Sequence, residues 1–174
     1  LPTMTRNRGG LTPRQRFIRA SRHDLEGMGL TQAISYSLTT IEKAKQFQIK
    51  PLAEPMKLDF PMSSDHVATR MNIVSGLLND IAYNVARNVD NVALYEEGRV
   101  FLPMGDERPA EQEHLAAAVT GQMVANSWNK KDQPVDFFQL KGIVERYLKN
   151  MGIAGKVAYV PTSDRPEMHP GRTA

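Results

Sequence analysis

The sequence predicts an α+β fold in which an antiparallel β-sheet is flanked by helices. Segments with helical periodicity alternate with short strand-like segments, and the connections between them differ widely in length. Two strand-like segments, 92–101 and 115–119, are separated by about a dozen loop residues, a spacing that favours an antiparallel pair. A chain of 174 residues that is 41% hydrophobic can bury a core of this kind.

The first predicted helix runs from Pro13 to Met28 and follows residues 1–11, which we interpret as a linker from a preceding domain. Thr12 is suited to the N-cap, and Pro13 lies in the first turn, where its missing N–H has no partner to lose. Gly29 provides the stop. An arc roughly 100° wide on this helix holds Phe17, Ile18, Ser21, Leu25 and Met28.

The next segments are shorter. Gln32–Leu38 alternates apolar and polar residues and is predicted to be a strand. Thr39 and Glu42 have the spacing of a capping box, which predicts a helix over residues 40–47. Residues 56–60 lie in a proline-rich stretch and are at most a short strand.

Another helix is predicted over Asn72–Asn88, and a strand over Val92–Phe101. Leu115–Val119 is a nearly continuous apolar run, typical of a strand covered on both faces. Asp136 is expected to cap a helix that reaches Met151, and Lys156–Val160 is expected to be a last strand. The apolar arc of the helix over 72–88, about 140° wide, holds Ile73, Val74, Leu77, Leu78, Ile81 and Val85.

Composition excludes several classes of function. The chain has no cysteine, so it has neither disulfides nor thiolate metal sites, which fits a cytoplasmic protein. No run of eighteen apolar residues occurs, so no membrane span is expected. No two of the four histidines have i, i+4 spacing, and no residues assemble a nucleophile, a base and an anion hole; we therefore expect no metal site, cofactor site or catalytic residue. The histidines are His23, His66, His114 and His169.

The charge of the chain is mildly basic, with a formal net charge of +3, and its excess is local. Six arginines precede the first acidic residue, Asp24. Such a block can contact phosphate backbones, but the interpretation that we favour is a solvated arm followed by one polar helix face. These arginines are Arg6, Arg8, Arg14, Arg16, Arg19 and Arg22.

Several stretches together resemble the β subunit of bacterial phenylalanyl-tRNA synthetase, in its part similar to a class II catalytic domain. A helix ending in "GMG" is followed by "YSL", and "DH" precedes "RMNIVSGLL". The strand "EEGRVF", the segment "DFFQLKG" and the ending "HPGRTA" continue the family's pattern in the same order. One departure is Thr69-Arg70-Met71, where the family commonly has Leu-Arg-Thr, so only Arg70 matches there.

This resemblance implies a class II aminoacyl-tRNA synthetase-like fold over residues 12–174, truncated at its C-terminal end. It also implies an α subunit that carries the active site, an α2β2 heterotetramer, and use of ATP and magnesium by the whole enzyme. The helix over 13–28 would correspond to the class II dimerisation helix. Its apolar residues are therefore candidates for a subunit interface: Phe17, Ile18, Leu25 and Met28.

The same resemblance bears on ATP binding. Class II sites need an arginine on the strand and further charged groups just after it, because adenylate formation develops negative charge that must meet fixed donors. Arg99 matches the strand arginine, but Leu102 and Met104 stand where the family's α subunit would have ionic side chains. We interpret Arg70 and Arg99 as remnants of a degenerate nucleotide site. An alternative for Arg99 is a salt bridge with Glu97 or Asp106.

The leading hypothesis is a non-catalytic assembly domain of a phenylalanine–tRNA ligase, which supports the α subunit and is inactive by itself. The alternative is a tRNA-binding module on the basic first helix, with Arg16, Arg19 and Arg22 as the candidate contacts. The sequence alone does not separate apolar faces that form a subunit interface from those that form the core.

Overall fold

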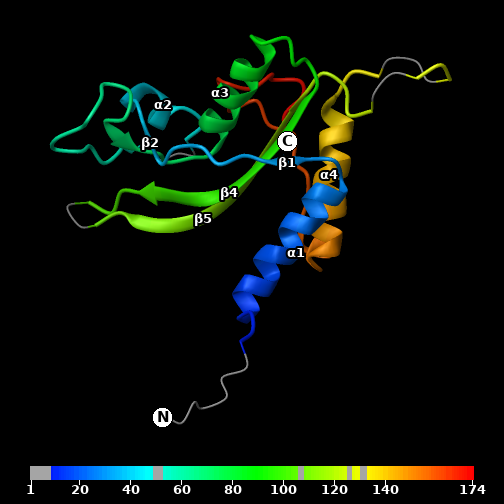
Figure 1. Ribbon diagram of the computed structural model, residues 1–174, viewed down its shortest axis with the longest axis horizontal. Helices are drawn as coiled ribbons and strands as arrows, with labels where there is room; N and C mark the ends of the chain where they lie inside the picture. The colour runs from blue at the N-terminus through cyan, green and yellow to red at the C-terminus, as the bar shows by residue number, and fades with distance from the viewer. Residues whose placement is uncertain (1–8, 49–52, 106–107, 125–126, 130–132) are drawn as a thin grey trace, which may run out of the picture.

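A computed structural model describes residues 9–48, 53–105, 108–124, 127–129 and 133–174 of the chain. Its centre is a long hairpin of β4 (Val92–Leu102) and β5 (Ala110–Thr120). Helix α3 (Val74–Val85) packs against this hairpin from one side, and α1 (Pro13–Gly27) and α4 (Phe137–Asn150) lie together beside it on the other (Figure 1). The predicted α+β class is thereby confirmed.

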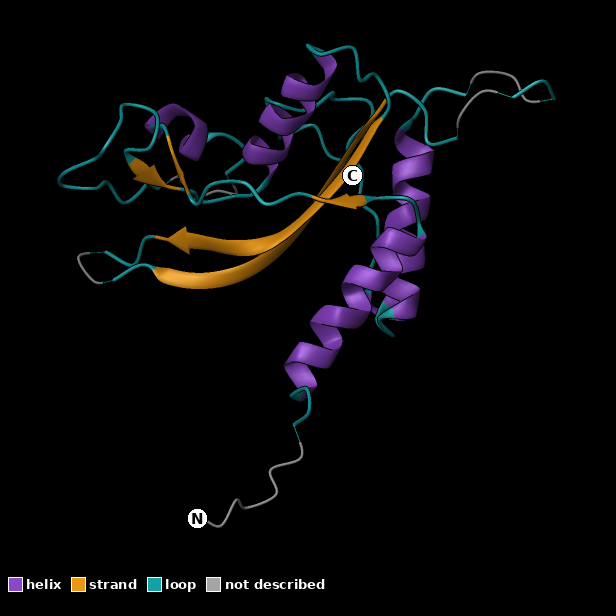
Figure 2. Ribbon diagram, in the orientation of Figure 1, coloured by secondary structure: helices purple, strands orange, loops and turns teal. Residues whose placement is uncertain are grey.

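The sheet is mixed in direction. β4 and β5 pair antiparallel, as the spacing of the two segments predicts, and their register places Arg99 opposite Glu113. The short strand β1 (Thr31–Gln32) adds to the other edge of β4, and it runs parallel to it. Figure 2 shows the two long strands curving together beneath α3. The antiparallel prediction therefore describes the hairpin but not its third strand.

The two faces of the hairpin contact two different hydrophobic clusters, because successive side chains of a strand point to opposite sides. On one face, Val100 packs with Ile73 and Leu77 of the α3 segment, and Ala116 and Ala118 pack around them. On the other, Tyr95 packs with Leu25 and Leu30, and Ala117, Met28, Ile143 and Tyr147 surround this second cluster. Apolar contacts on both faces explain why "LAAAV" in β5 has no clear alternation.

Helices α1 and α4 begin as predicted. Thr12 caps α1, where its hydroxyl accepts from the backbone N–H of Gln15 and the Gln15 side chain accepts from the N–H of Thr12. Asp136 accepts from the N–H of Gln139 at the start of α4. Gly29, at φ 91°, ends the α1 segment in the left-handed region that a glycine adopts without strain. The predicted linker over residues 1–11 lies outside the described residues for its first eight positions.

A second, smaller sheet lies beside α3. It pairs β2 (Leu38–Thr39) with β3 (Ala68–Thr69), next to the short helix α2 (Ile41–Lys45). The cap of α2 is Thr40 and not Thr39, because the Thr40 hydroxyl accepts from Lys43 N–H.

Several predicted strands are wrong or shorter than expected. The ladder expected over 32–38 is interrupted: after Ala33 donates to the carbonyl of Tyr95, the chain leaves β4 and rejoins a ladder only at β2. The strand expected over 56–60 reduces to an isolated bridge at Lys57. The strand expected over 156–160 is absent, and a 3-10 turn, η1 (Ala154–Lys156), lies at its start.

Two elements have different bounds from those expected. α3 covers Val74–Val85 and not 72–88, since Asn88 adopts φ 62° beyond its end. β5 begins at Ala110, five residues before the predicted start, because its polar first half still pairs with β4. Among the described residues, no helix is long and apolar enough to cross a membrane.

Candidate functional site

A buried polar cluster lies between β4 and α3, on the face of the sheet that packs against that helix. Its centre is Glu96, which is 2% exposed and accepts from Arg70 Nη1 at 2.5 Å and from the Ser35 hydroxyl at 2.7 Å. The same hydroxyl lies 2.9 Å from Oδ2 of Asp80 on α3. Segments far apart in the sequence are therefore joined through one carboxylate.

Arg70 is held on both sides of its guanidinium. Its Nε donates to the backbone carbonyl of Arg99 at 2.8 Å while Nη1 binds Glu96, and the residue is 7% exposed. Gly98 makes room for it, since a Cβ at that position would lie 2.2 Å from Arg70 Nη2. The glycine in "EEGRVF" thus leaves room for the close approach of an arginine side chain, and it lies within a strand and not in a turn.

A cavity of about 410 Å³ opens above this cluster. Ser35, Arg70 and Asp80 are among its less exposed lining residues, and we refer to these three as its floor. Ile34 and Tyr36 line it as well, and they are 87% and 78% exposed. The cavity therefore combines a polar floor with an apolar rim, at the face of the sheet covered by α3.

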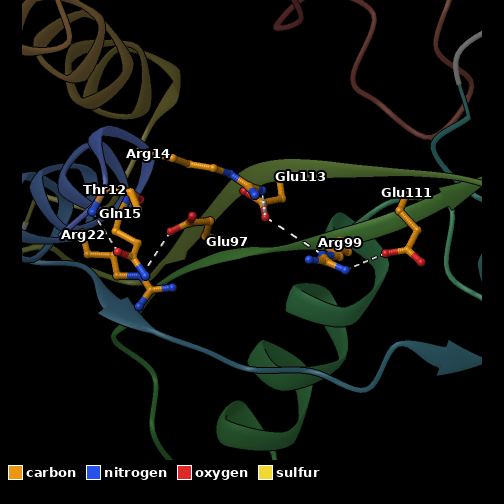
Figure 3. A network of polar contacts seen from close by, with 8 residues as sticks. All are labelled: Thr12, Arg14, Gln15, Arg22, Glu97, Arg99, Glu111 and Glu113. Carbon is orange, nitrogen blue, oxygen red and sulfur yellow. Dashed lines mark hydrogen bonds and ion pairs between the residues drawn. The ribbon is translucent and has the colours of Figure 1, made fainter. Parts of the chain in front are cut away.

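Arg99 points to the opposite face of the sheet from the Arg70–Glu96 pair. Its Nη1 donates to Glu111 Oε2 at 2.6 Å, and its Nε lies 4.0 Å from Glu113. Figure 3 shows both glutamates on the neighbouring strand β5. The predicted salt bridge of Arg99 is therefore formed, but with Glu111 and not with Glu97; Asp106 lies outside the described residues.

Helix α1 is tied to the same face by arginines (Figure 3). Arg22 donates to Glu97 at 3.1 Å, and Arg14 binds Glu113. Of the three candidate tRNA contacts, Arg22 is thus used within the chain. Arg16 and Arg19 are exposed, and no carboxylate of the described residues forms an ion pair with them. Arg6 and Arg8 lie outside the described residues.

The four candidate interface residues of α1 do not share one environment. Leu25 is 3% exposed and belongs to the core, and Met28 packs against it. Leu25 therefore contributes to the chain's own interior, which corrects the prediction for this residue, whereas Met28 is only partly buried and stays a candidate. Phe17 is 53% exposed, and Ile18 is half-buried beside it in a cavity of about 280 Å³ between α1 and the hairpin. Only this N-terminal half of α1 presents an apolar surface.

The two arginines interpreted as remnants of a nucleotide site are not arranged around one common position. Arg70 and Arg99 lie on opposite faces of β4, so their guanidinium groups do not converge on one phosphate, and Arg70 is neutralised by Glu96. Leu102 packs against the Ile73–Leu77–Val100 cluster, and Met104 is 59% exposed; neither side chain can bind a phosphate. Within the described part of the chain, no group of three metal-ligating side chains lies close enough to hold a metal ion.

Comparison with known proteins identifies the family. The family model described as the phenylalanyl-tRNA synthetase β-chain CLM domain matches residues 1–174. The chain belongs to this family. The resemblance found in the sequence is thereby confirmed.

Curated relatives align with the whole chain and support the same family. The phenylalanine–tRNA ligase β subunit of Lactiplantibacillus plantarum is 55% identical over 175 residues, and that of Latilactobacillus sakei is 50% identical over 175. The β subunit of Bacillus cereus is 44% identical over 176 residues. All of the chain aligns in each case, but the chain spans only 22% of the length of these relatives.

Solved structures confirm the class II synthetase-like fold. A pyrrolysyl-tRNA synthetase from Desulfitobacterium hafniense superimposes with a TM-score of 0.56 at 14% identity, over 81% of this chain and 46% of the other. An ATP phosphoribosyltransferase regulatory subunit/histidyl-tRNA synthetase from Bacillus halodurans gives 0.57 at 13% identity, over 89% and 39%. At such low identity, the similarity concerns the fold alone.

Sequence reasoning missed the polar cluster itself. Glu96 and Glu97 are neighbours on β4 and point to opposite faces: Glu96 binds Arg70, and Glu97 binds Arg22 of α1. Neither Ser35 nor Asp80 stood out, because their contact depends on how α3 packs over the segment after β1. The one available signal was Gly98 beside two acidic residues in a strand, which indicates that another group approaches the backbone.

Proposed function

We propose that the chain is a non-catalytic assembly domain in the β subunit of a phenylalanine–tRNA ligase, and that it holds an α subunit in a competent arrangement. The ligase activity belongs to the whole enzyme, which uses ATP and magnesium, and the assembly is an α2β2 heterotetramer. Within it, residues 12–174 form one class II-like domain. The chain acts as a rigid support that catalyses no step.

The single observation that carries the non-catalytic role is the Arg70–Glu96 ion pair. A nucleotide site needs cationic side chains free to meet phosphate oxygens. Here the buried cation is already matched by a buried carboxylate, and a phosphate in its place would face Glu96 and Asp80. Like charges at such distances repel strongly in a partly desolvated site.

Exposed apolar side chains support the assembly role. Phe17 on α1 is 53% exposed, and on the outer side of α3 Leu78 is 43% and Tyr83 60% exposed. Single exposed apolar residues are ordinary, but large aromatic and aliphatic side chains on two helices suit obligate interfaces, which resemble a core cut in half.

Co-purification tests the assembly role. In the full-length β subunit, Phe17→Asp places a charge on the exposed part of α1, and we expect it to lower recovery of the co-expressed α subunit at least tenfold, since buried interface charges are costly. Phe60→Asp is the matched control: Phe60 is 92% exposed, on the loop that precedes β3. Full recovery of the α subunit with Phe17→Asp, measured by size-exclusion chromatography with light scattering, contradicts α1 as the interface.

A second candidate function is tRNA binding on α1, and the exposure of Arg16 and Arg19 favours it. These two cations, rather than Arg22, are its contacts, because Arg22 is paired with Glu97. Charge reversal at both positions (Arg16→Glu, Arg19→Glu) should weaken tRNA binding and reduce its salt dependence, with the slope of log affinity against log salt falling by about 2. An unchanged slope dismisses this candidate.

A further inference from the structure

The floor of the cavity above the Arg70–Glu96 pair contains more hydrogen-bond acceptors than donors. The Ser35 hydroxyl lies 2.7 Å from Glu96 and 2.9 Å from Asp80, but a hydroxyl carries one proton and donates to one carboxylate at a time. Glu96 has Arg70 as a second partner. Among the described residues, no cation forms an ion pair with Asp80. The floor therefore presents a partly buried carboxylate whose charge is not neutralised by an ion pair within the described part of the chain.

The charges that line the cavity also favour a cation. Arg70 is matched by Glu96 beneath the floor. The other charged lining residues are Lys43, Asp65 and Asp80, which leaves one excess negative charge. An unpaired carboxylate beside low-dielectric walls attracts a cationic group and repels an anion.

The shape of the floor depends on a glycine. A Cβ at Gly76 of α3 would lie 2.9 Å from the Ser35 hydroxyl oxygen and 3.0 Å from its Cβ. The glycine therefore lets Ser35 approach α3 closely enough to reach Asp80, one turn further along the helix. Above the floor, Ile34 and Tyr36 expose apolar surface at the mouth.

We propose that this cavity binds a small molecule that carries one primary ammonium group next to an apolar group. The ammonium donates to Asp80 and to the Ser35 hydroxyl oxygen, and the apolar part lies against Ile34 and Tyr36. A volume of about 410 Å³ falls within the range of small-molecule sites and exceeds what one inserted side chain fills. The proposal goes beyond the assembly role and does not depend on it.

Two probes of equal chain length and opposite charge test the proposal: n-hexylamine and hexanoate. Binding is measured by saturation-transfer NMR on the full-length protein that contains this chain, in the assembly in which it is purified. We expect n-hexylamine to bind and hexanoate not to compete with it. The proposal is overturned if hexanoate binds as tightly as n-hexylamine, or if n-hexylamine does not bind.

Substitutions of single charged residues test whether n-hexylamine binds in this cavity. Asp80→Asn keeps the size of the side chain and an oxygen acceptor for Ser35, and it should weaken hexylamine binding by about tenfold or more, since hydrogen bonds to charged groups are the strong ones. Asp59→Asn, at an exposed aspartate that does not line the cavity, is the control and should bind as the unchanged protein does. Equal binding by Asp80→Asn and the unchanged protein overturns the proposal.

A variant with the opposite expected effect guards against a loss caused by misfolding. Lys43 lines the cavity and forms no ion pair among the described residues. Lys43→Gln removes this positive charge, so it should tighten hexylamine binding several-fold. Weaker binding by this variant, with an unchanged melting temperature, contradicts the proposed electrostatics. Because these experiments measure ligand binding and not subunit recovery, their failure is distinct from a failure of the assembly role.

Discussion

Arg70 and Glu96 form an ion pair inside the molecule, with Nη1 and Oε1 2.5 Å apart and both side chains less than a tenth exposed. Arg70 follows β3, and Glu96 lies in the middle of β4. The pair joins the smaller sheet to the central hairpin. One contact thus bears both on the stability of the fold and on the proposed non-catalytic role.

Breaking this pair from one side should be strongly destabilising. Glu96→Gln leaves the Arg70 charge buried without a counterion, so we expect the free energy of unfolding to fall by about 3 kcal/mol or more in urea denaturation. The control is Glu111→Gln, which breaks the exposed pair with Arg99 and should cost less than about 1 kcal/mol. Replacing both buried partners with apolar residues (Arg70→Met with Glu96→Leu) should restore most of the loss. Equal effects of the two single variants would contradict a buried pair.

Gly98→Ala should act through the same arginine. The added Cβ would lie 2.2 Å from Arg70 Nη2, so the guanidinium must shift and weaken its contact with Glu96. We expect a loss of about 1–3 kcal/mol in the free energy of unfolding, as for other overpacked sites. Gly142→Ala in α4 is the control, because its added Cβ meets no atom within 4 Å apart from its chain neighbours and the backbone of its own helix. A helical alanine should stabilise by about 0.5–1 kcal/mol. Gly98→Ala should lower the free energy of unfolding and Gly142→Ala should raise it. A Gly98→Ala variant as stable as the unchanged protein contradicts the close contact with Arg70.

The helices were predictable because their signals are local. Thr12, Asp136 and Gly29 mark helix ends through bonds to neighbouring residues, and the structure has each in that role. The paired strands β4 and β5 were also predictable from their spacing. The beginning of β5 was not, since its polar residues are in a strand only because β4 lies opposite them.

Features that depend on packing were beyond the sequence. The alternation in Gln32–Leu38 predicts a half-buried strand, but Ile34 and Tyr36 point to solvent because the chain leaves β4 after Ala33. Leu25 and Phe17 share one helical arc, yet the first is core and the second is exposed, since α4 and the hairpin cover only part of α1. Arg70 and Arg99 were grouped by resemblance, and only the direction of each side chain shows that they lie on opposite faces.

Arg99→Ala tests whether the strand arginine has any role in catalysis. Its side chain is 58% exposed and binds glutamates of the neighbouring strand, so removing it should change the free energy of unfolding by less than about 1 kcal/mol. In the assembled enzyme, tRNA charging should stay within about twofold of the unchanged rate. Removing a group that stabilises transition-state charge typically lowers kcat by about a hundredfold or more. A loss of that size in a charging assay would contradict the non-catalytic role.

The alkaline limit of stability should depend on Tyr95. Burial, together with the hydrogen bond to Glu26 at 3.1 Å, raises the pKa of Tyr95 to about 12. An unfolded tyrosine has a pKa near 10, so between these values the folded state retains a proton that the unfolded state has lost. The stabilising contribution is therefore complete below about pH 10 and is lost as the pH rises towards 12, by roughly 2–3 kcal/mol.

Tyr95→Phe isolates this contribution, because the variant keeps the ring in the Leu25–Leu30 core and removes the titrating hydroxyl. The difference in unfolding free energy between the two proteins should be constant below about pH 10 and should shift in favour of the variant above it. Urea denaturation at several pH values gives this difference, and the difference in absorbance near 295 nm between the unchanged protein and the variant isolates the Tyr95 phenolate from those of the other four tyrosines. A difference in unfolding free energy that does not vary up to pH 12, or a Tyr95 phenolate that forms at the ordinary pKa, would contradict the raised pKa of Tyr95.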